Sequence, residues 1–250
     1  MSAAVRLEFP QGYLWPPWDL FMELTCSLDS HSWILVGGLM VQAHALLHGI
    51  TSRATSDIDL LIDVLADTSH IELIISRLEE LQFEIQIPGL RDAPFHRLRR
   101  GKDVVDVLVA DHLPSGAHRR ARIGRLRFFE TEGGAQALER RMEVTLKGYG
   151  EERIFFMPDV LGALVMKSAA YSPSGRNSIR HLEDAALLAS LIEDVDEQAS
   201  RLHGSDRKHI RKAYEALSDP LHETWSLYTN NEQSRILYTL RVLAGIDRTK

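Results

Sequence analysis

The sequence predicts an α+β fold, with a mixed β-sheet and flanking helices over residues 1–157 and an α-helical region over residues 158–250. Two observations lead to this class. In the first half, short apolar runs typical of strands alternate with segments whose apolar residues recur at a helical period. In the second half almost every segment has helical character, and proline and glycine separate one from the next. A length of 250 residues is sufficient for one large or two small domains.

Hydrophobic residues make up 44% of the chain and charged residues 26%, which excludes disordered and fibrous proteins. The formal net charge of −6 argues against a protein that coats nucleic acid by bulk charge. Cys26 is the only cysteine, so no disulfide framework or cysteine-rich zinc site is expected. No apolar stretch reaches the roughly 20 residues of a membrane span, and residues 1–18 show no secretory signal. We therefore expect a cytoplasmic protein without a membrane partner.

The predicted strands of the first half are apolar runs that end at turn residues. Trp33–Val36 is such a run and stops at Gly37-Gly38, where a turn is expected before a helix over residues 39–48. Residues 69–81 predict a second helix, because their apolar positions recur close to a helical period and Ser69 can cap it. The remaining strands are predicted over residues 57–64, 83–87, 95–98, 104–109, 143–146 and 153–156.

The second half is predicted to be a series of helices. Pro158 is expected to open the first, which runs to about residue 171, because proline suits the first helical position. Pro173 and Gly175 then interrupt the helical pattern. Further helices are predicted over residues 179–192, 205–217 and 232–244.

The most informative feature is a pair of aspartates, Asp57 and Asp59, at the start of a predicted strand. Residues i and i+2 of a strand point to the same face, so the two carboxylates project together, roughly 6.6 Å apart along the strand. Carboxylates held side by side repel each other unless a cation lies between them. Mg²⁺ usually takes one or two carboxylates plus substrate phosphates, so the pair predicts a magnesium site. Solvated acids at a strand end are the alternative.

A second feature lies upstream, where Gly37-Gly38 marks the passage from a predicted strand to a helix. Glycine lets a phosphate approach the backbone, and a helix N-terminus supplies amide donors and the positive end of the helix dipole. The glycine pair therefore favours phosphate binding, although a tight strand–helix turn alone would need the same residues.

A glycine pair at a helix start followed by Asp-x-Asp on the next strand resembles the nucleotidyltransferase superfamily that includes DNA polymerase beta. The closer resemblance is to its AbiEii-like group, the toxins of type IV toxin–antitoxin systems, also called MenT toxins. It covers roughly residues 33–190. The stretches that carry it are Gly37-Gly38, Arg53-x-Thr55-x-Asp57-Ile-Asp59-Leu60, Leu161-Gly-Ala-Leu-Val-Met-Lys167-Ser-Ala-Ala-Tyr171, and Arg176 with Arg180-His181-Leu-Glu-Asp184.

The resemblance implies a nucleotidyltransferase fold followed by the helical domain, and transfer of a nucleoside monophosphate from a nucleoside triphosphate (NTP) to an acceptor hydroxyl with release of pyrophosphate. It also implies two Mg²⁺ ions. The implied metal ligands are Asp57, Asp59 and Asp106. The implied catalytic residues are Asp57, Asp59, Asp106, Lys167 and Asp184. The residues implied to bind the nucleotide are Gly37, Gly38, Arg53, Thr55 and Lys167.

Several of these residues have plainer alternatives. Asp106, which is costly to bury alone, is either a metal ligand and general base or the partner of an arginine such as Arg97 or Arg99. Lys167 either contacts the triphosphate or extends its ammonium to solvent. Asp184 either binds the nucleotide, holds Lys167 in place, or is an acid on a helix surface. Arg53 either clamps a phosphate or is a loop arginine without a fixed partner.

The acceptor implied by the resemblance is RNA, namely the 3′ end of tRNA, whose modification would block translation. A cognate antitoxin protein is an implied partner, and phosphorylation of Thr55 would add negative charge beside the carboxylates. Residues 91–127 carry ten Lys and Arg against four Asp and Glu and could follow an RNA backbone. Residues 207–212 form a second basic cluster. A solvated basic face is the alternative for both.

Three other functions remain open from the sequence. The same chemistry could act on a small molecule, as in aminoglycoside or lincosamide nucleotidyltransferases. An acidic acceptor pocket would favour this alternative. The chemistry could instead act on a hydroxyl of a protein. A non-catalytic relative that binds only nucleotide, RNA or a protein is the third, although all the expected acids are present.

Overall fold

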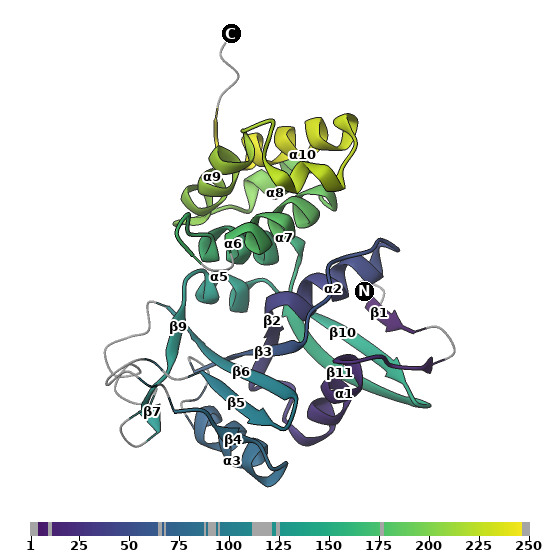
Figure 1. The fold of residues 1–250 in the computed structure, drawn as a ribbon, viewed down its shortest axis with the longest axis vertical. Helices are drawn as coiled ribbons and strands as arrows, with labels where there is room; N and C mark the ends of the chain where they lie inside the picture. The colour runs from purple at the N-terminus through teal and green to yellow at the C-terminus, as the bar shows by residue number, and fades with distance from the viewer. Residues whose placement is uncertain are drawn as a thin grey trace. The chain divides into compact units, whose positions relative to one another are not determined.

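The computed structural model describes residues 5–9, 12–64, 67, 69–87, 89, 94, 96–111, 122–123, 126–175 and 178–246. The chain divides into two compact units, Met1–Pro158 and Asp159–Lys250. The first unit contains mixed β-sheets with helices and the second contains helices (Figure 1). The predicted α+β class is confirmed at this level. None of the helices in the described ranges has the length and hydrophobicity needed to cross a bilayer.

The larger sheet of the first unit carries the acidic strands. Its order is β2 (Trp33–Val36), β3 (Asp57–Ile62), β6 (Asp103–Ala110), β5 (Arg97–Arg100) and β4 (Glu84–Ile85), with β9 (Phe129–Thr131) also paired to β6. Strand β3 runs parallel to β6 and antiparallel to β2, and β5 is antiparallel to β6. Burial of β2 on both faces explains its continuous apolar sequence.

A smaller sheet has the order β1 (Val5–Glu8), β10 (Arg141–Gly148) and β11 (Glu151–Pro158). The hairpin between β10 and β11 turns at Tyr149 and Gly150, whose φ angles are 52° and 79°. Positive φ at both central residues is what a two-residue hairpin of matching twist requires. Strands β7 (Arg122–Ile123) and β8 (Leu126–Arg127) form a separate two-stranded pair.

The helices of the first unit are α1 (Trp18–Ser27), α2 (Gly37–Leu47), α3 (His70–Glu80) and α5 (Gly134–Glu139), within the described residues. Helix α2 packs against β2 and β3. The sequence predicted a turn at Gly37-Gly38 and a helix from residue 39, whereas the structure places both glycines in the first turn of α2. The turn and the helix start therefore coincide, because Gly37 adopts a φ of +70° directly after β2.

An aromatic cluster joins the two sheets. Phe21 of α1 makes edge-to-face contacts with Trp18, with Trp33 of β2 at 5.9 Å and with Phe155 of β11 at 5.0 Å between ring centroids. Phe21, Trp18 and Phe155 are fully buried. Helix α1 therefore forms part of the core between the larger and the smaller sheet, a role that its sequence did not predict.

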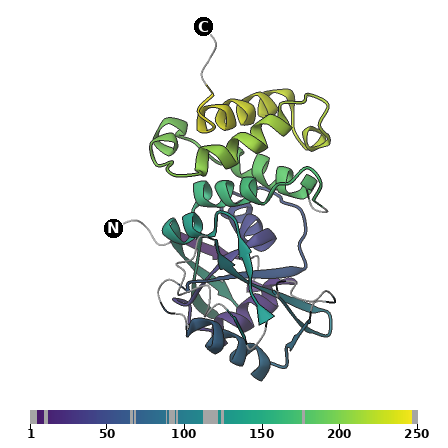
Figure 2. The same ribbon diagram turned by 90° about the vertical axis from the view of Figure 1, so that its left-hand side faces the viewer.

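The second unit consists of α6 (Val160–Ala170), α7 (Ser178–Ser190), α8 (Val195–Ser200), α9 (Asp206–Leu217), the 3₁₀-helix η2 (Glu223–Leu227) and α10 (Asn230–Leu243) (Figure 2). Pro158 does not open α6 as predicted, because it is the last residue of β11. The N-cap is Asp159, whose side chain accepts a hydrogen bond of 2.8 Å from the Gly162 amide. Thr229 and Glu232 form a capping box at the start of α10.

Replacement of Phe155 by alanine is expected to lower the free energy of unfolding of the first unit by about 3–5 kcal/mol, because it removes the ring that contacts Phe21 and leaves a cavity. The neighbouring Ile154 is 47% exposed, so Ile154→Ala is the matched control and is expected to cost less than about 1 kcal/mol. Urea denaturation followed by tryptophan fluorescence measures both. Equal losses for the two variants would contradict the packing described.

Candidate functional site

Three aspartates of the larger sheet share one face. Asp59 of β3 lies directly opposite Asp106 of β6 in the parallel register, and Asp57 is two residues before Asp59. Opposed residues on neighbouring strands, and residues i and i+2 on one strand, point to the same side of a sheet. The structure therefore brings together the acid pair predicted from one strand and the third acid predicted from another.

Arg97 of β5 lies between two of these acids. Its Nε and Nη2 donate to Oδ1 and Oδ2 of Asp106 at 2.8 and 2.7 Å, and Nη2 also donates to Oδ2 of Asp57 at 3.2 Å. The Asp106 side chain is 9% exposed, whereas those of Arg97 and Asp57 are 37% and 35% exposed. The ion pair to Arg97, one alternative raised from the sequence, is present, and Asp106 as a metal ligand stays a prediction.

The carboxylates around Arg97 favour the charged form of its guanidinium. The hydrogen bonds to Asp106, together with the negative charges of Asp106, Asp57 and Asp59, raise the pKa of the Arg97 guanidinium above its usual value, although partial burial opposes this. An arginine guanidinium is protonated in proteins, so Arg97 contributes a positive charge to the site. The three carboxylates and this one cation have a formal net charge of −2 at pH 7.

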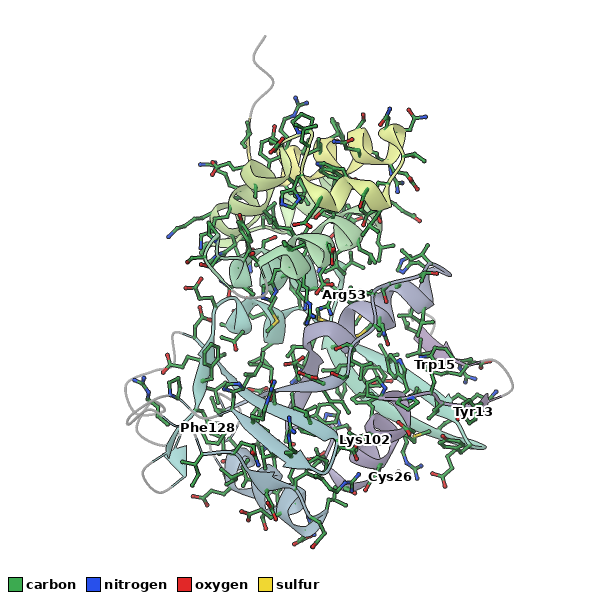
Figure 3. The ribbon with its side chains drawn as sticks, in the orientation of Figure 1. Tyr13, Trp15, Cys26, Arg53, Lys102 and Phe128 are labelled. Atoms are coloured by element: carbon green, nitrogen blue, oxygen red, sulfur yellow. The ribbon has the colours of Figure 1, made fainter. Side chains whose placement is uncertain are left out.

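The glycine pair lies against the acidic strand. A Cβ atom built on Gly37 would lie 1.7 Å from Oδ2 of Asp59, and one built on Gly38 would lie 2.7 Å from Oγ1 of Thr55 and 3.2 Å from Nη2 of Arg53. Arg53 is labelled beside α2 in Figure 3. Only glycine fits position 37, because it must have both a positive φ and no side chain. The structure thus places these five predicted residues in one locality of the first unit.

A residue that the sequence reasoning missed holds this locality in place. Gln42 of α2 donates from Nε2 to the carbonyl oxygen of Arg53 at 3.2 Å, and its Oε1 accepts from Nε1 of Trp18 at 3.0 Å. Residues 50–56 form no helix or strand, so this amide connects the Arg53 backbone to the core. The sequence feature that could have indicated Gln42 is its position as a polar residue within the mostly apolar helix predicted over residues 39–48.

The donor set of the site fits a divalent cation in part. Asp57 and Asp59 offer carboxylate oxygens from one face of one strand, which is the ligand type that Mg²⁺ takes together with substrate phosphates. Both oxygens of Asp106 accept hydrogen bonds from Arg97, and the two oxygens of Asp57 accept from Ser56 Oγ and from Arg97 Nη2. Across the described ranges, no cluster of three or more His, Cys, Asp or Glu side chains is arranged to hold a metal ion. Asp57 and Asp59 thus offer the ligand type that a divalent cation takes, and metal binding by them stays a prediction.

Lys167 and Asp184 form a buried ion pair in the second unit. Nζ of Lys167 on α6 lies 2.8 Å from Oδ2 of Asp184 on α7, and the two side chains are 6% and 2% exposed. The ammonium does not extend to solvent, and Asp184 does not lie on a helix surface. Burial raises the pKa of the nearby Tyr228 hydroxyl, and the charges of Glu183, Glu232 and Asp184 raise it further. Contact of Lys167 with a nucleotide stays a prediction.

Several basic residues of the two basic stretches are engaged by the fold. Arg100 pairs with Glu23 at 2.7 Å and with Asp103 at 3.1 Å, and the hydrogen bonds from Arg100 lower the pKa of the Glu23 carboxyl. In the second cluster, Arg207 and Arg211 donate to backbone carbonyls at the end of α10. Residues 91–93, 95, 112–121 and 124–125 of the first basic stretch, and Arg176, lie outside the described residues. RNA contact by either stretch stays a prediction.

Because Gly37 lies against Asp59, we expect the substitution Gly37→Ala to lower the free energy of unfolding more than an ordinary glycine-to-alanine change does. Gly37→Ala combines a positive φ with a collision against the Asp59 carboxylate, whereas Gly49 has a φ of +67° and open space around its Cα. We expect Gly37→Ala to lose about 2 kcal/mol or more beyond the roughly 1 kcal/mol expected for Gly49→Ala. Urea denaturation of the two variants measures the difference. Equal stabilities would show that Asp59 does not occupy this position.

The Lys167–Asp184 pair predicts strong non-additivity. Lys167→Met leaves a buried carboxylate without its partner and is expected to cost about 3–5 kcal/mol. The double variant Lys167→Met/Asp184→Leu removes both charges and is expected to regain most of that loss. A double-mutant cycle by thermal and urea denaturation tests this. Additive losses would contradict a direct, buried interaction.

Comparison with protein-family models, with curated proteins and with solved structures gave no match. The structure by itself shows a mixed α+β class. The support for a function comes from the arrangement of this chain's own residues.

Proposed function

We propose that this protein is a divalent-cation-dependent nucleotidyltransferase, with the nucleotidyltransferase fold in its first unit, which transfers a nucleoside monophosphate from an NTP to a hydroxyl at the 3′ end of tRNA. The observation that carries the proposal is the contact between the start of α2 and the acidic strand. Gly37 and Gly38 lie directly against Asp59, Thr55 and Arg53. A phosphate-binding element and a cation-binding element are thus adjacent within one unit.

The start of α2 has the properties of a polyphosphate site. Its first backbone amides have no partner within the helix, and the positive end of the helix dipole favours anions. The two glycines add no side chain of their own beside these amides, although the side chains of Asp59, Thr55 and Arg53 lie against them. Arg53, whose Nη2 lies beside Gly38, supplies a guanidinium suited to phosphate oxygens.

The acidic face supplies the second half of the chemistry. Asp57 and Asp59 would hold the divalent cation, which when bound stabilises negative charge on the attacking and leaving oxygens of phosphoryl transfer. In the proposed reaction the acceptor hydroxyl gives its proton to solvent water, and its oxygen forms a bond to the α-phosphorus. The bond from that phosphorus to the β-phosphate bridging oxygen breaks, and pyrophosphate leaves. Alignment of the two reactants is the main contribution of the protein.

The choice of tRNA rests on the resemblance to AbiEii-like toxins through Gly37-Gly38, the stretch from Arg53 to Asp59, and Lys167 with Asp184. A translation-blocking role and a cognate antitoxin belong to the same proposal. The acidic face, whose three carboxylates and Arg97 have a formal net charge of −2, repels RNA phosphates until a cation is bound, so binding of the acceptor is expected to depend on Mg²⁺.

The full chain incubated with total tRNA, Mg²⁺ and each of the four α-labelled NTPs is expected to label RNA with at least one nucleotide. Asp57→Asn and Asp59→Asn are each expected to reduce labelling by about 100-fold or more, because each removes a cation ligand. Glu79→Gln, which changes an exposed acid of α3, is the matched control and is expected to leave labelling unchanged.

The outcomes separate the alternatives. Absence of labelled RNA with all four NTPs would overturn tRNA as the acceptor, and label on an aminoglycoside or on a protein would identify a different acceptor for the same chemistry. Labelling that survives both aspartate substitutions would overturn the proposed site.

A further inference from the structure

The face of the larger sheet that carries the aspartates also carries an exposed aromatic side chain. Phe129 of β9 lies directly opposite Leu108 of β6 in a parallel register, and Leu108 is two residues after Asp106. Paired residues on neighbouring strands, and residues i and i+2 of one strand, point to the same side of a sheet. Phe129 therefore shares the face of Asp106, at a Cα–Cα distance of roughly 8 Å given by strand spacing and rise.

The Phe129 ring is exposed and held in a defined position. Phe129 is 42% exposed, whereas its neighbour Phe128 is 1% exposed and belongs to the core. The ring of His96, directly before β5, contacts the Phe129 ring edge to face, with 5.6 Å between the ring centroids. Such a contact orients the Phe129 ring and uses at most one of its two faces. The other face of the ring is therefore not used by His96.

The parts of the site follow one another across the sheet. Helix α2, whose start is the proposed polyphosphate site, packs against β2 and β3. Strand β6 lies on the other side of β3, and β9 pairs with β6, as Figure 1 shows. The carboxylates of β3 and β6 therefore lie between the start of α2 and Phe129.

This order assigns a side of the site to the acceptor. The attacking and leaving oxygens of phosphoryl transfer lie in line, on opposite sides of the phosphorus. When the pyrophosphate leaves at the start of α2, the acceptor hydroxyl has to approach from the side of β6 and β9. Phe129 is the exposed aromatic residue on that side.

The chemistry of this side favours a nucleobase. Bases of single-stranded RNA stack on aromatic side chains whatever their sequence, because every base has a π-face. Arg127, which is exposed and two residues before Phe129, supplies a positive charge suited to the phosphates of the same strand. An aminoglycoside, the alternative acceptor, has no aromatic ring that could stack on Phe129.

We propose that Phe129 stacks on the base of the 3′-terminal nucleotide of the acceptor RNA and thereby positions its hydroxyl in front of the carboxylates. This inference rests on the proposed function and deepens it, because it names the part of the acceptor that is recognised and the residue that recognises it. Phe129 binds the substrate and takes no part in the bond changes.

Binding of an RNA hairpin with a single-stranded 3′ end tests the inference without catalysis. The hairpin carries fluorescein at its 5′ end, and fluorescence anisotropy gives its affinity for the full chain in the presence of Mg²⁺. Phe129→Ala is expected to weaken binding by about tenfold, because one aromatic stack is lost. Phe129→Tyr keeps an aromatic ring and is expected to bind within about twofold of wild type.

A hairpin that lacks the base of its 3′-terminal nucleotide identifies the contact. The wild-type protein is expected to bind this abasic RNA about tenfold more weakly than the complete hairpin, whereas Phe129→Ala is expected to bind the two RNAs equally well. An equal loss of affinity in both proteins would overturn the inference, because the base would then contact another residue.

Three controls accompany these measurements. Leu73 of α3 is also apolar and is 47% exposed, so Leu73→Ala is expected to leave RNA affinity unchanged. Should Phe129→Ala unfold, Phe129→Leu keeps an apolar side chain without an aromatic ring and is expected to bind RNA more weakly than Phe129→Tyr. Calorimetry is expected to give the same NTP affinity for Phe129→Ala as for wild type. A loss of NTP affinity as large as the loss of RNA affinity would assign Phe129 to the nucleotide and overturn the inference.

The outcomes for this inference and for the proposed function are distinguishable. Labelling of tRNA with the same KM for tRNA in wild type and Phe129→Ala would overturn the inference and leave the proposed function intact. Weaker RNA binding by Phe129→Ala, in a protein that labels no RNA with any NTP, would overturn the proposed function and retain Phe129 as an RNA-binding residue.

Discussion

The register between β3 and β6 is the constraint on which the candidate site depends. The parallel pairing sets Asp59 opposite Asp106, and the antiparallel pairing of β6 with β5 sets Arg97 opposite Asp106 in the same row. A slip of one residue in either pairing would move a whole strand's side chains to the other face. The apolar residues between the charged ones, such as Ile58 and Val105, are fully buried, so the hydrophobic core itself enforces the alignment of the charges.

Gly37 extends this constraint from the sheet to α2. The helix begins where β2 ends, and it can approach β3 only because position 37 has no side chain beside Asp59. The mostly apolar surface of α2 then packs on β2 and β3. The helix start that is proposed to bind phosphate and the pair of carboxylates are consequently parts of one packed unit, and neither depends on the placement of a long loop.

Much of this arrangement could be predicted from the sequence, for identifiable reasons. Strands such as Trp33–Val36 are continuous apolar runs, and Asp-x-Asp on a strand places both acids on one face whatever the surroundings. The bridge by Arg97 could not be chosen in advance, because Arg97 and Arg99 share one face of β5 and only the register decides which one meets Asp106. The part of α1 in the core could not be predicted, because Phe21 packs against Trp33 and Phe155, which are distant from it in sequence.

The amide of Gln42 has a consequence that reaches beyond the site. Its oxygen accepts a hydrogen bond from the indole of Trp18, and its nitrogen donates one to the carbonyl oxygen of Arg53. The buried Trp18 side chain and the loop that contains Arg53 are therefore connected through this one amide. Substitutions that shift Trp18 of α1 would move Gln42, and through it the backbone of Arg53, without changing any residue of the acidic face. The position of Arg53, and with it the proposed phosphate site, is thus sensitive to buried residues that touch neither the glycines nor the carboxylates.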